Sequence, residues 1–191
     1  NEYERDTYVT EITTSNSGDA DFIPVIYQGD KLIFTSSRDM STGENNDSWT
    51  GDKYYDLYVA NIKDVTSFSA PELFKGPFNA AYNDGTLAFN KDYSEVYFTR
   101  CGSDDRKVDD YCGIYVSNYL PDGGWSEPVA LPFFDDTMNI GTPCLSLDGN
   151  TLFFAATNPD GYGGADIYMS RRTESGWDAA YNAGQVINTS G

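Results

Sequence analysis

The chain has 191 residues, of which 30 are acidic, 12 are basic and none is histidine, so its net charge at pH 7 is −18. This negative charge argues against sequence-independent binding to nucleic-acid phosphates, and we expect no nucleic-acid partner. Without histidine, the chain cannot form a Ser-His-Asp triad and lacks a common zinc ligand. Its 15% aromatic residues, 18 glycines and 8 prolines are typical of a strand-rich globular protein with many turns.

Three further features of the sequence bear on where in the cell the protein is located. No apolar run approaches the roughly 20 residues of a membrane-spanning helix, so direct insertion into a membrane is not expected. The first residue is Asn1 rather than methionine, which suggests a mature or excised piece whose targeting information lies elsewhere. The negative charge fits a highly soluble exported surface, with an acidic docking face as the alternative.

Three repeats follow one another along the chain, each with the same order of parts. A short apolar strand comes first, at 22–27, 86–90 and 143–146. A central aromatic strand follows and carries Phe34, Phe98 or Phe154. A third strand carries Tyr58, Tyr115 or Tyr168, and the aromatic residue that opens the last part is Phe68, Trp125 or Trp177.

Each repeat therefore contains about four short strands separated by Gly, Asp, Asn and Pro, which is the pattern of a β-propeller blade. We predict an all-β fold with four-stranded antiparallel blades at 21–79, 80–139 and 140–191. Residues 1–20 resemble the outer strand of a preceding blade, because Asn16 matches Asn188 in its sequence context. Propellers close with 4 to 8 blades, so we expect a part of a larger ring, six-bladed or similar.

The third repeat carries a family resemblance. It reads SLDGNTLFF at 146–154, GYGGADIY at 161–168, Gly-Trp at 176–177 and VINT at 186–189. This order resembles the WD40-like propeller repeat shared with the TolB C-terminal domain. The Gly-Gly before Asp-Ile-Tyr is most similar to propellers of Bacteroidetes envelope proteins of the OmpA family, among them the peptidoglycan-linked lipoprotein of the type IX secretion apparatus.

The resemblance implies a non-catalytic scaffold in the periplasm or at the outer membrane, without a cofactor. It would dock envelope or secretion-machinery proteins, while domains outside this chain would anchor to lipid or peptidoglycan. The first two repeats depart from the pattern, because Tyr93-Ser94-Glu95 replaces the Asp-Gly turn in the second and residues 39–55 are inserted in the first.

Several motif residues have structural explanations. Asp148-Gly149 predicts a tight hairpin turn, since glycine tolerates positive φ. Asp56 and Asp166 open equivalent strands and are expected to cap turns. Trp125 and Trp177 are expected to pack between neighbouring blades.

No catalytic or metal site is expected. The acidic pairs of the loops are explained by the number of acids, whereas glycoside hydrolysis needs two acids facing each other across a cleft. A cation near Asp160 and Asp166 is an alternative to a simple bend at Gly163-Gly164, but the regular ligand spacing of a calcium loop is missing.

The cysteines predict one disulfide. Cys101 ends the central strand of the second repeat and Cys112 begins the next strand, so antiparallel pairing would bring their Cα atoms to roughly 5–6 Å. A Cys101–Cys112 bond would contribute about 3 kcal/mol in the chain-entropy model and favours an oxidising compartment. Cys144, in a short inner strand, is expected to be a buried free thiol.

The candidate partner-binding residues are aromatic. Trp49, Tyr54 and Tyr55 lie in the polar insertion 39–55, and Tyr162 lies in the equivalent loop of the third repeat. Exposed aromatic residues are enriched at interfaces, but these rings could also fold back onto the blade. In the alternative function, a carbohydrate-binding or carbohydrate-active propeller, they would stack on sugar rings. A structural spacer without a ligand is a third possibility.

Overall fold

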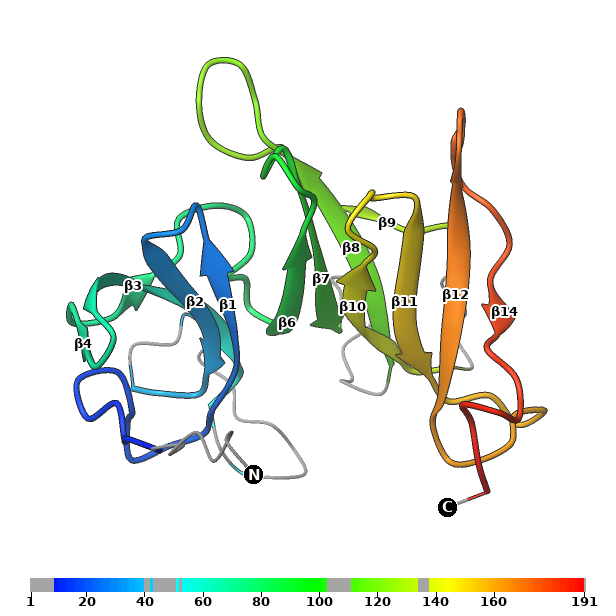
Figure 1. Cartoon of the computed structure of the whole chain (residues 1–191), viewed down its shortest axis with the longest axis horizontal. Helices are drawn as coiled ribbons and strands as arrows, with labels where there is room; N and C mark the ends of the chain where they lie inside the picture. The colour runs from blue at the N-terminus through cyan, green and yellow to red at the C-terminus, as the bar shows by residue number, and fades with distance from the viewer. Residues whose placement is uncertain are drawn as a thin grey trace, which may run out of the picture.

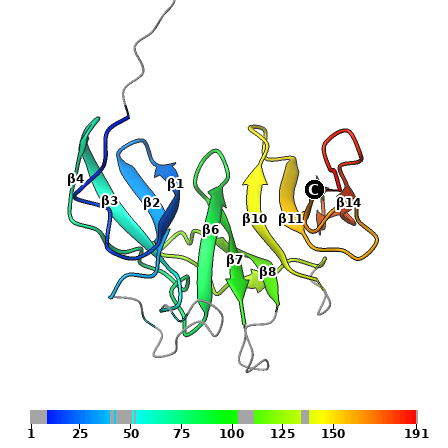
Figure 2. The ribbon, with the colours of Figure 1, turned by 90° about the horizontal axis from the view of Figure 1, so that it is seen from below.

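The computed structural model describes residues 9–39, 42, 51, 53–102, 111–133 and 138–190. They form an all-β structure of three antiparallel sheets, which stand side by side in chain order (Figures 1 and 2). Within these residues, no helix has the length and apolar character needed to cross a membrane.

Sheet I has the strand order β1-β2-β3-β4, and β5 also pairs with β3. Its strands are β1 (Asp21–Tyr27), β2 (Lys31–Ser36), β3 (Asp56–Asp64), β4 (Ser67–Phe68) and β5 (Glu72–Leu73). Sheet II has the order β6-β7-β8-β9. Its strands are β6 (Asn83–Phe89), β7 (Glu95–Cys101), β8 (Cys112–Asn118) and β9 (Val129–Ala130).

Sheet III has the order β10-β11-β12-β13, and β14 pairs with β12. Its strands are β10 (Ile140–Leu145), β11 (Thr151–Ala156), β12 (Asp166–Thr173), β13 (Gly176–Trp177) and β14 (Tyr181–Asn182). The three sheets begin close to the predicted repeat starts, and the described residues 9–20 contain a turn and no strand.

The register of the strands is the same in the three sheets, as the repeat alignment predicts. The central aromatic residue always lies opposite the tyrosine of the third strand, in the pairs Phe34–Tyr58, Phe98–Tyr115 and Phe154–Tyr168. The repeats are therefore equivalent in structure as well as in sequence.

The outer strand differs from the prediction of a single fourth strand. In sheets I and III it is split into two two-residue pieces, and in sheet II an isolated bridge between Tyr119 and Trp125 precedes β9. Pro71 and Pro128 stand at the interruption in sheets I and II, where a proline cannot donate to the strand ladder.

The first strand of each sheet contains a bulge. Ile23, Thr86 and Thr142 have positive φ angles of 49°, 37° and 56°, and the register shifts around each of them. The bulge turns a main-chain N–H toward the preceding sheet. The N–H of Thr86 donates to Thr35 Oγ1 at 3.1 Å, and that of Thr142 donates to Thr99 Oγ1 at 2.9 Å.

Two apolar clusters fill the spaces between neighbouring sheets. The first joins sheets I and II through Ile33, Leu57, Phe78, Val96 and Phe98, with Trp125 against it. The second joins sheets II and III through Tyr97, Ile114, Leu152 and Phe154, with Trp177 against it. The expectation that both tryptophans pack between repeats is confirmed.

The hairpin turn predicted at Asp148-Gly149 is confirmed. Gly149 has a φ of 71°, in the region that glycine favours. Asp148 Oδ1 accepts hydrogen bonds from Ser146 Oγ at 2.5 Å and from the N–H of Asn150 at 3.0 Å, so the aspartate fixes the turn.

Candidate functional site

The connections from the second to the third strand leave all three sheets at the same end, the lower end in Figure 1. The partner-binding candidates Tyr54, Tyr55 and Tyr162 belong to this loop-bearing end. Trp49 lies outside the described residues. Tyr54 is buried, with 8% of its surface exposed, and Tyr55 packs edge-on against Phe22 with ring centroids 5.1 Å apart.

Tyr162 remains open, with 48% of its surface exposed. Among the three candidates that the structure describes, Tyr162 alone is exposed. Tyr55 instead folds back onto Phe22 of sheet I, the second of the two outcomes considered for the insertion, and Tyr54 is buried. A surface contact through Tyr54 is therefore not supported, because its ring is enclosed.

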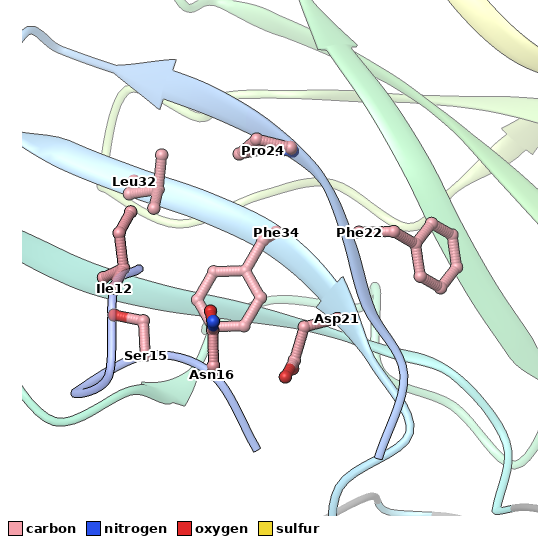
Figure 3. Close-up of a pocket in the computed structure, with 8 residues that line it drawn as sticks. All are labelled: Ile12, Ser15, Asn16, Asp21, Phe22, Pro24, Leu32 and Phe34. Atoms are coloured by element: carbon pink, nitrogen blue, oxygen red, sulfur yellow. The ribbon is translucent and has the colours of Figure 1, made fainter. Parts of the chain in front are cut away.

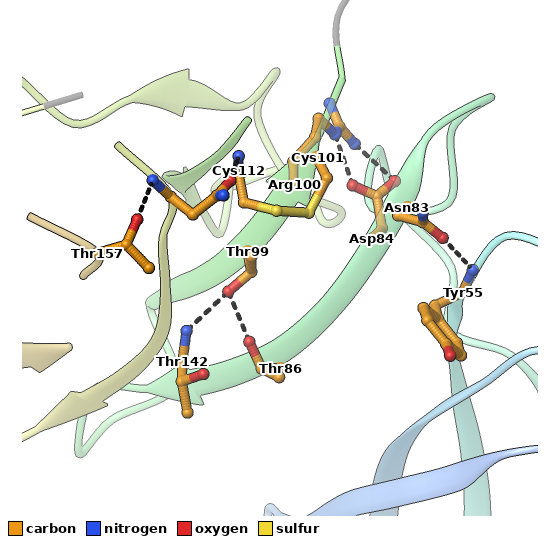
Figure 4. Close-up of a disulfide and its surroundings, with 11 residues drawn as sticks. Tyr55, Asn83, Asp84, Thr86, Thr99, Arg100, Cys101, Cys112, Thr142 and Thr157 are labelled. Atoms are coloured by element: carbon orange, nitrogen blue, oxygen red, sulfur yellow. Dashed lines mark hydrogen bonds and ion pairs between the residues drawn. A yellow bond between two sulfur atoms is a disulfide. The ribbon is translucent and has the colours of Figure 1, made fainter. Parts of the chain in front are cut away.

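A Cys101–Cys112 disulfide lies at this end of sheet II (Figure 4). The two cysteines face each other in the register of β7 and β8, as the spacing predicts. Their Cα atoms are 3.9 Å apart, closer than the distance expected from antiparallel pairing. The bond closes the β7–β8 connection and fits an exported protein.

The expectation of a buried thiol at Cys144 is wrong, because this cysteine is free and exposed. The register of β10 shifts between Gly141 and Cys144. A shift of register exchanges the faces to which the side chains point, so Leu145, and not Cys144, packs against the apolar cluster of sheets II and III.

The carboxylates that open β3 and β12 cap turns, as predicted. Asp56 accepts hydrogen bonds from the N–H and Oγ1 of Thr42, with Oδ2 at 2.5 and 3.0 Å. Asp166 Oδ2 accepts from the N–H of Tyr162 at 2.6 Å and from Asn182 Nδ2 at 2.9 Å. Burial raises the pKa of Asp56 above its usual value.

Two ion pairs at the same end, one partly buried and one with a fully buried carboxylate, are absent from the sequence-based site. Asp21 bonds Arg38 at 2.6 Å, and Asp84 bonds Arg100 at 2.6 Å (Figure 4). The Asp84 carboxylate is fully buried, and this burial raises its pKa to about 7 although Arg100 opposes the rise. The signal available in the sequence was an acid early in the first strand and an arginine near the end of the aromatic strand, within it at Arg100 and just after it at Arg38.

Sheet III replaces this ion pair by an apolar pair. Asp84 lies opposite Arg100 in sheet II, whereas Ile140 lies opposite Ala156 at the same register position in sheet III. The acids of this end therefore secure loops within their own sheets. In the part of the chain that the structure describes, no group of three or more Cys, Asp or Glu side chains could hold a metal.

A polar groove of about 540 Å³ lies at the opposite end, between the β6–β7 and β10–β11 turns. Its lining includes Lys91, Asp92, Glu95, Asp148 and Arg172. The Arg172 guanidinium crosses from sheet III to Glu95 of sheet II with bonds of 3.0 and 2.6 Å. The groove therefore has a fixed cation–anion pair in its wall and exposed acids on its two turns.

A smaller pocket of about 110 Å³ lies on the side of sheet I that faces away from sheet II (Figure 3). Ile12, Leu32 and Phe34 supply its apolar wall, and they belong to a third apolar cluster with Tyr58 and Phe68. The segment before β1 thus covers part of this outer face.

No family model and no curated protein matches the chain. Among solved structures, it is similar to the crystal structure of an α-L-arabinofuranosidase from Lactobacillus brevis, with a TM-score of 0.51 and 14% sequence identity. The match covers 81% of this chain and 52% of that one, so the chain spans about half the length of the structure that it matches. A likeness at this identity concerns the fold alone.

Proposed function

We propose that the three sheets are consecutive blades of a β-propeller and that the propeller is a non-catalytic, protein-binding scaffold of an envelope complex. The proposed location is the periplasm or the outer-membrane surface, and the proposed partners are secretion-machinery or peptidoglycan-associated proteins. The disulfide supports an oxidising compartment, and the resemblance of the third repeat supplies the class of complex.

The observation that carries the proposal is the exposed face of sheet III. Leu57 and Ile167 are equivalent, because each exchanges two hydrogen bonds with a following asparagine, Asn79 or Asn188. Leu57 is fully buried against sheet II, whereas Ile167 is 39% exposed.

The residues that precede these two asparagines differ in exposure in the same way. Phe78 is fully buried between sheets I and II, while its counterpart Ile187 is 62% exposed. Val186, which precedes Ile187 in the chain, and Tyr162 of the β11–β12 connection are also exposed. Sheet III thus offers the type of face that sheets I and II bury against each other, and such a face suits a further blade or a partner protein.

A crosslinking pull-down from native cell envelopes with the full-length protein tests the scaffold role. The Tyr162→Ala, Ile187→Ser double variant should recover several-fold less of a defined secretion or peptidoglycan-associated partner. Trp49→Ala in the same experiment tests the insertion. Val65→Ser is the matched control, since Val65 is also exposed but lies in the β3–β4 turn; equal loss in this control would count against a specific face.

Carbohydrate binding is the second candidate function. The solved structure that the chain resembles is an α-L-arabinofuranosidase. The polar groove is lined by acids and amides of the kind that bind sugar hydroxyls, among them Asn90, Asp92, Asp148 and Asn150. Binding fits the groove better than cleavage, because Glu95 is paired with Arg172, and Asp92 and Asp148 are held by Ser94 and Ser146 of their own turns.

A glycan array followed by titration of the best ligand tests this candidate. Binding that is lost in Asp148→Asn with Asn150→Ala, and turnover of a polysaccharide, would favour it over the scaffold. Absence of glycan binding together with recovery of a protein partner would favour the scaffold.

A further inference from the structure

The outer face of sheet I carries an asparagine whose amide is unused. Asn16 lies in the segment before β1, is exposed, and lines the pocket formed with Ile12, Leu32 and Phe34 (Figure 3). Within the part of the chain that the structure describes, its main-chain N–H donates to the Ile12 carbonyl oxygen and its side-chain amide is free. A donor and an acceptor are therefore available at the edge of this pocket.

The equivalent asparagine of sheet II shows what such an amide binds. Asn16 and Asn79 each lie five residues before an aspartate of a first strand, Asp21 or Asp84. Each aspartate accepts the N–H of the residue after the asparagine and pairs with an arginine. Asn79 Oδ1 accepts the N–H of Leu57 at 2.7 Å, and its Nδ2 donates to the Leu57 carbonyl oxygen at 3.2 Å. The amide thus holds the main chain of one residue in a strand of the neighbouring sheet.

The wall of the pocket matches the wall that encloses this residue. Leu57 is fully buried in the apolar cluster that joins sheets I and II, together with Val96 and Phe98. The register places Leu32 and Phe34 of sheet I at the positions of Val96 and Phe98 in sheet II. An aliphatic side chain on an extended segment therefore has the same apolar surroundings available on the outer face of sheet I.

One position differs between the two faces. The residue before Asn79 is Phe78, which is fully buried between sheets I and II, whereas the residue before Asn16 is Ser15. Ser15 is 4% exposed, and its hydroxyl has no hydrogen-bond partner among the described residues. A buried hydroxyl without a partner is costly. The pocket of about 110 Å³ beside it is large enough for one aliphatic side chain.

We propose that this face binds an extended segment of a partner protein, with a leucine or isoleucine in the pocket and the main-chain N–H and C=O of that residue bonded to the Asn16 amide. Main-chain bonds give affinity in such strand recognition, and a side-chain pocket gives specificity. Leu57 is the precedent between sheets I and II, and Ile114 takes the equivalent place between sheets II and III.

Two observations favour a separate partner as the occupant. Sheets I and II fill the position of Ser15 with the Phe78 ring, so a serine suits a segment that binds reversibly better than a permanently packed sheet. A second copy of the chain does not supply the segment through sheet III, because Asn188 already holds the main chain of Ile167 there. The inference rests on the proposed scaffold function, for which it names the element that a partner would present.

Titration of the chain with the peptide YDLYVAN, which has the sequence of residues 55–61, tests the proposal. This peptide contains the Leu57 strand that serves as the template. It should bind with a Kd of about 1 mM or tighter, and NMR shifts of the Asn16 side-chain amide should follow the titration. The same peptide with Leu57→Ser should bind about tenfold more weakly or worse, because the buried leucine is lost. Equal binding of the two peptides would overturn the proposal.

Asn16→Ala in the protein should weaken binding of the first peptide about tenfold, because two hydrogen bonds are lost. Asn118→Ala is the matched control, since Asn118 is an exposed asparagine at the end of β8, and it should keep the wild-type affinity. An unchanged affinity in Asn16→Ala would exclude the amide contact. This variant should fold, because the residue that it changes is exposed.

A parallel titration of the full-length protein, isolated without partners, identifies the source of the occupant. Peptide binding to the present chain but not to the full-length protein would assign the pocket to a further sheet of the same polypeptide and overturn the choice of a partner. The titrations are independent of the envelope pull-down, so a failed titration does not decide the scaffold role.

Discussion

At the scale of single residues, the Asp84–Arg100 pair offers a comparison within one molecule. Sheet III has Ile140 and Ala156 at the same register position, so the fold accepts either an ion pair or an apolar pair. Buried ion pairs gain little over apolar groups, but breaking one leaves an uncompensated charge. Removing one partner of the pair should therefore destabilise the fold, whereas replacing both partners by apolar residues should change the free energy of unfolding much less.

Asp84→Ala should therefore lower the free energy of unfolding by about 3–5 kcal/mol, because Arg100 is left unpaired in a buried site. The double variant Asp84→Ile, Arg100→Ala, which copies sheet III, should lose clearly less. Urea unfolding at pH 7 measures both. A double variant as unstable as the single one would show that the pair cannot be exchanged.

The raised pKa of Asp84, about 7, has a consequence for pH dependence. Because the folded state holds this proton more tightly than the unfolded state, the contribution of Asp84 to stability is full below pH 4 and is lost as the pH rises to 7. The loss is on the order of 4 kcal/mol. Relative to Asp84→Asn, the wild type should lose stability from pH 4 to pH 7; parallel curves would contradict the raised pKa.

At the scale of elements, the sheets are joined through the bulges of their first strands. Thr99 Oγ1 bonds the N–H of Thr142 at 2.9 Å and the hydroxyl of Thr86 at 2.6 Å (Figure 4). Thr99 stands on β7 between two first strands, so one hydroxyl connects sheet III to sheet II.

Thr99→Val keeps the shape of the side chain and removes this acceptor. It should lower the free energy of unfolding by about 0.5–1.5 kcal/mol, because the hydrogen bonds of Thr99 Oγ1 to the Thr142 N–H and the Thr86 hydroxyl are lost. Thr173→Val, at an exposed hydroxyl at the end of β12, should change it by less than about 0.5 kcal/mol. Chemical unfolding compares the two, and equal effects would argue against the bulge contact.

The disulfide closes the β7–β8 connection of sheet II. At the start of β8, Gly113 occupies the position that Asp56 and Asp166 occupy in sheets I and III. Thiol labelling should find one reactive cysteine, Cys144, in the native protein, and three only after reduction. Replacing Cys101 and Cys112 by alanine should cost about 3 kcal/mol. Three thiols labelled without reductant would exclude the bond.

At the scale of the whole molecule, residues at equivalent positions of the sheets differ in whether a neighbouring sheet covers them. Phe78→Ala should cost about 3–5 kcal/mol, because its ring fills the space between sheets I and II. Ile187→Ala should cost less than about 0.5 kcal/mol, since the side chain is exposed. Urea unfolding at two protein concentrations checks this; a large cost for Ile187→Ala would indicate that the face is covered by self-association.

Much of the molecule follows from local sequence. The repeat order, the register of Phe34 with Tyr58 and its two counterparts, the turn at Gly149 and the pairing of Cys101 with Cys112 depend on strand alternation, turn chemistry and spacing, which act over a few residues. The positions of the two tryptophans could be predicted because they recur at the same point of each repeat.

The remaining features depend on contacts between sheets. The exposure of Cys144 results from a bulge that no local pattern announces, and the position of Tyr55 results from its packing onto Phe22 of sheet I. The ion pair of Asp84, the free amide of Asn16 and the open face at Ile167 each depend on which groups the fold brings close or leaves uncovered. Sequence spacing determined the strands and their order, whereas only the tertiary structure decided which polar atoms are satisfied and which apolar faces are buried, because these depend on neighbours distant in the chain.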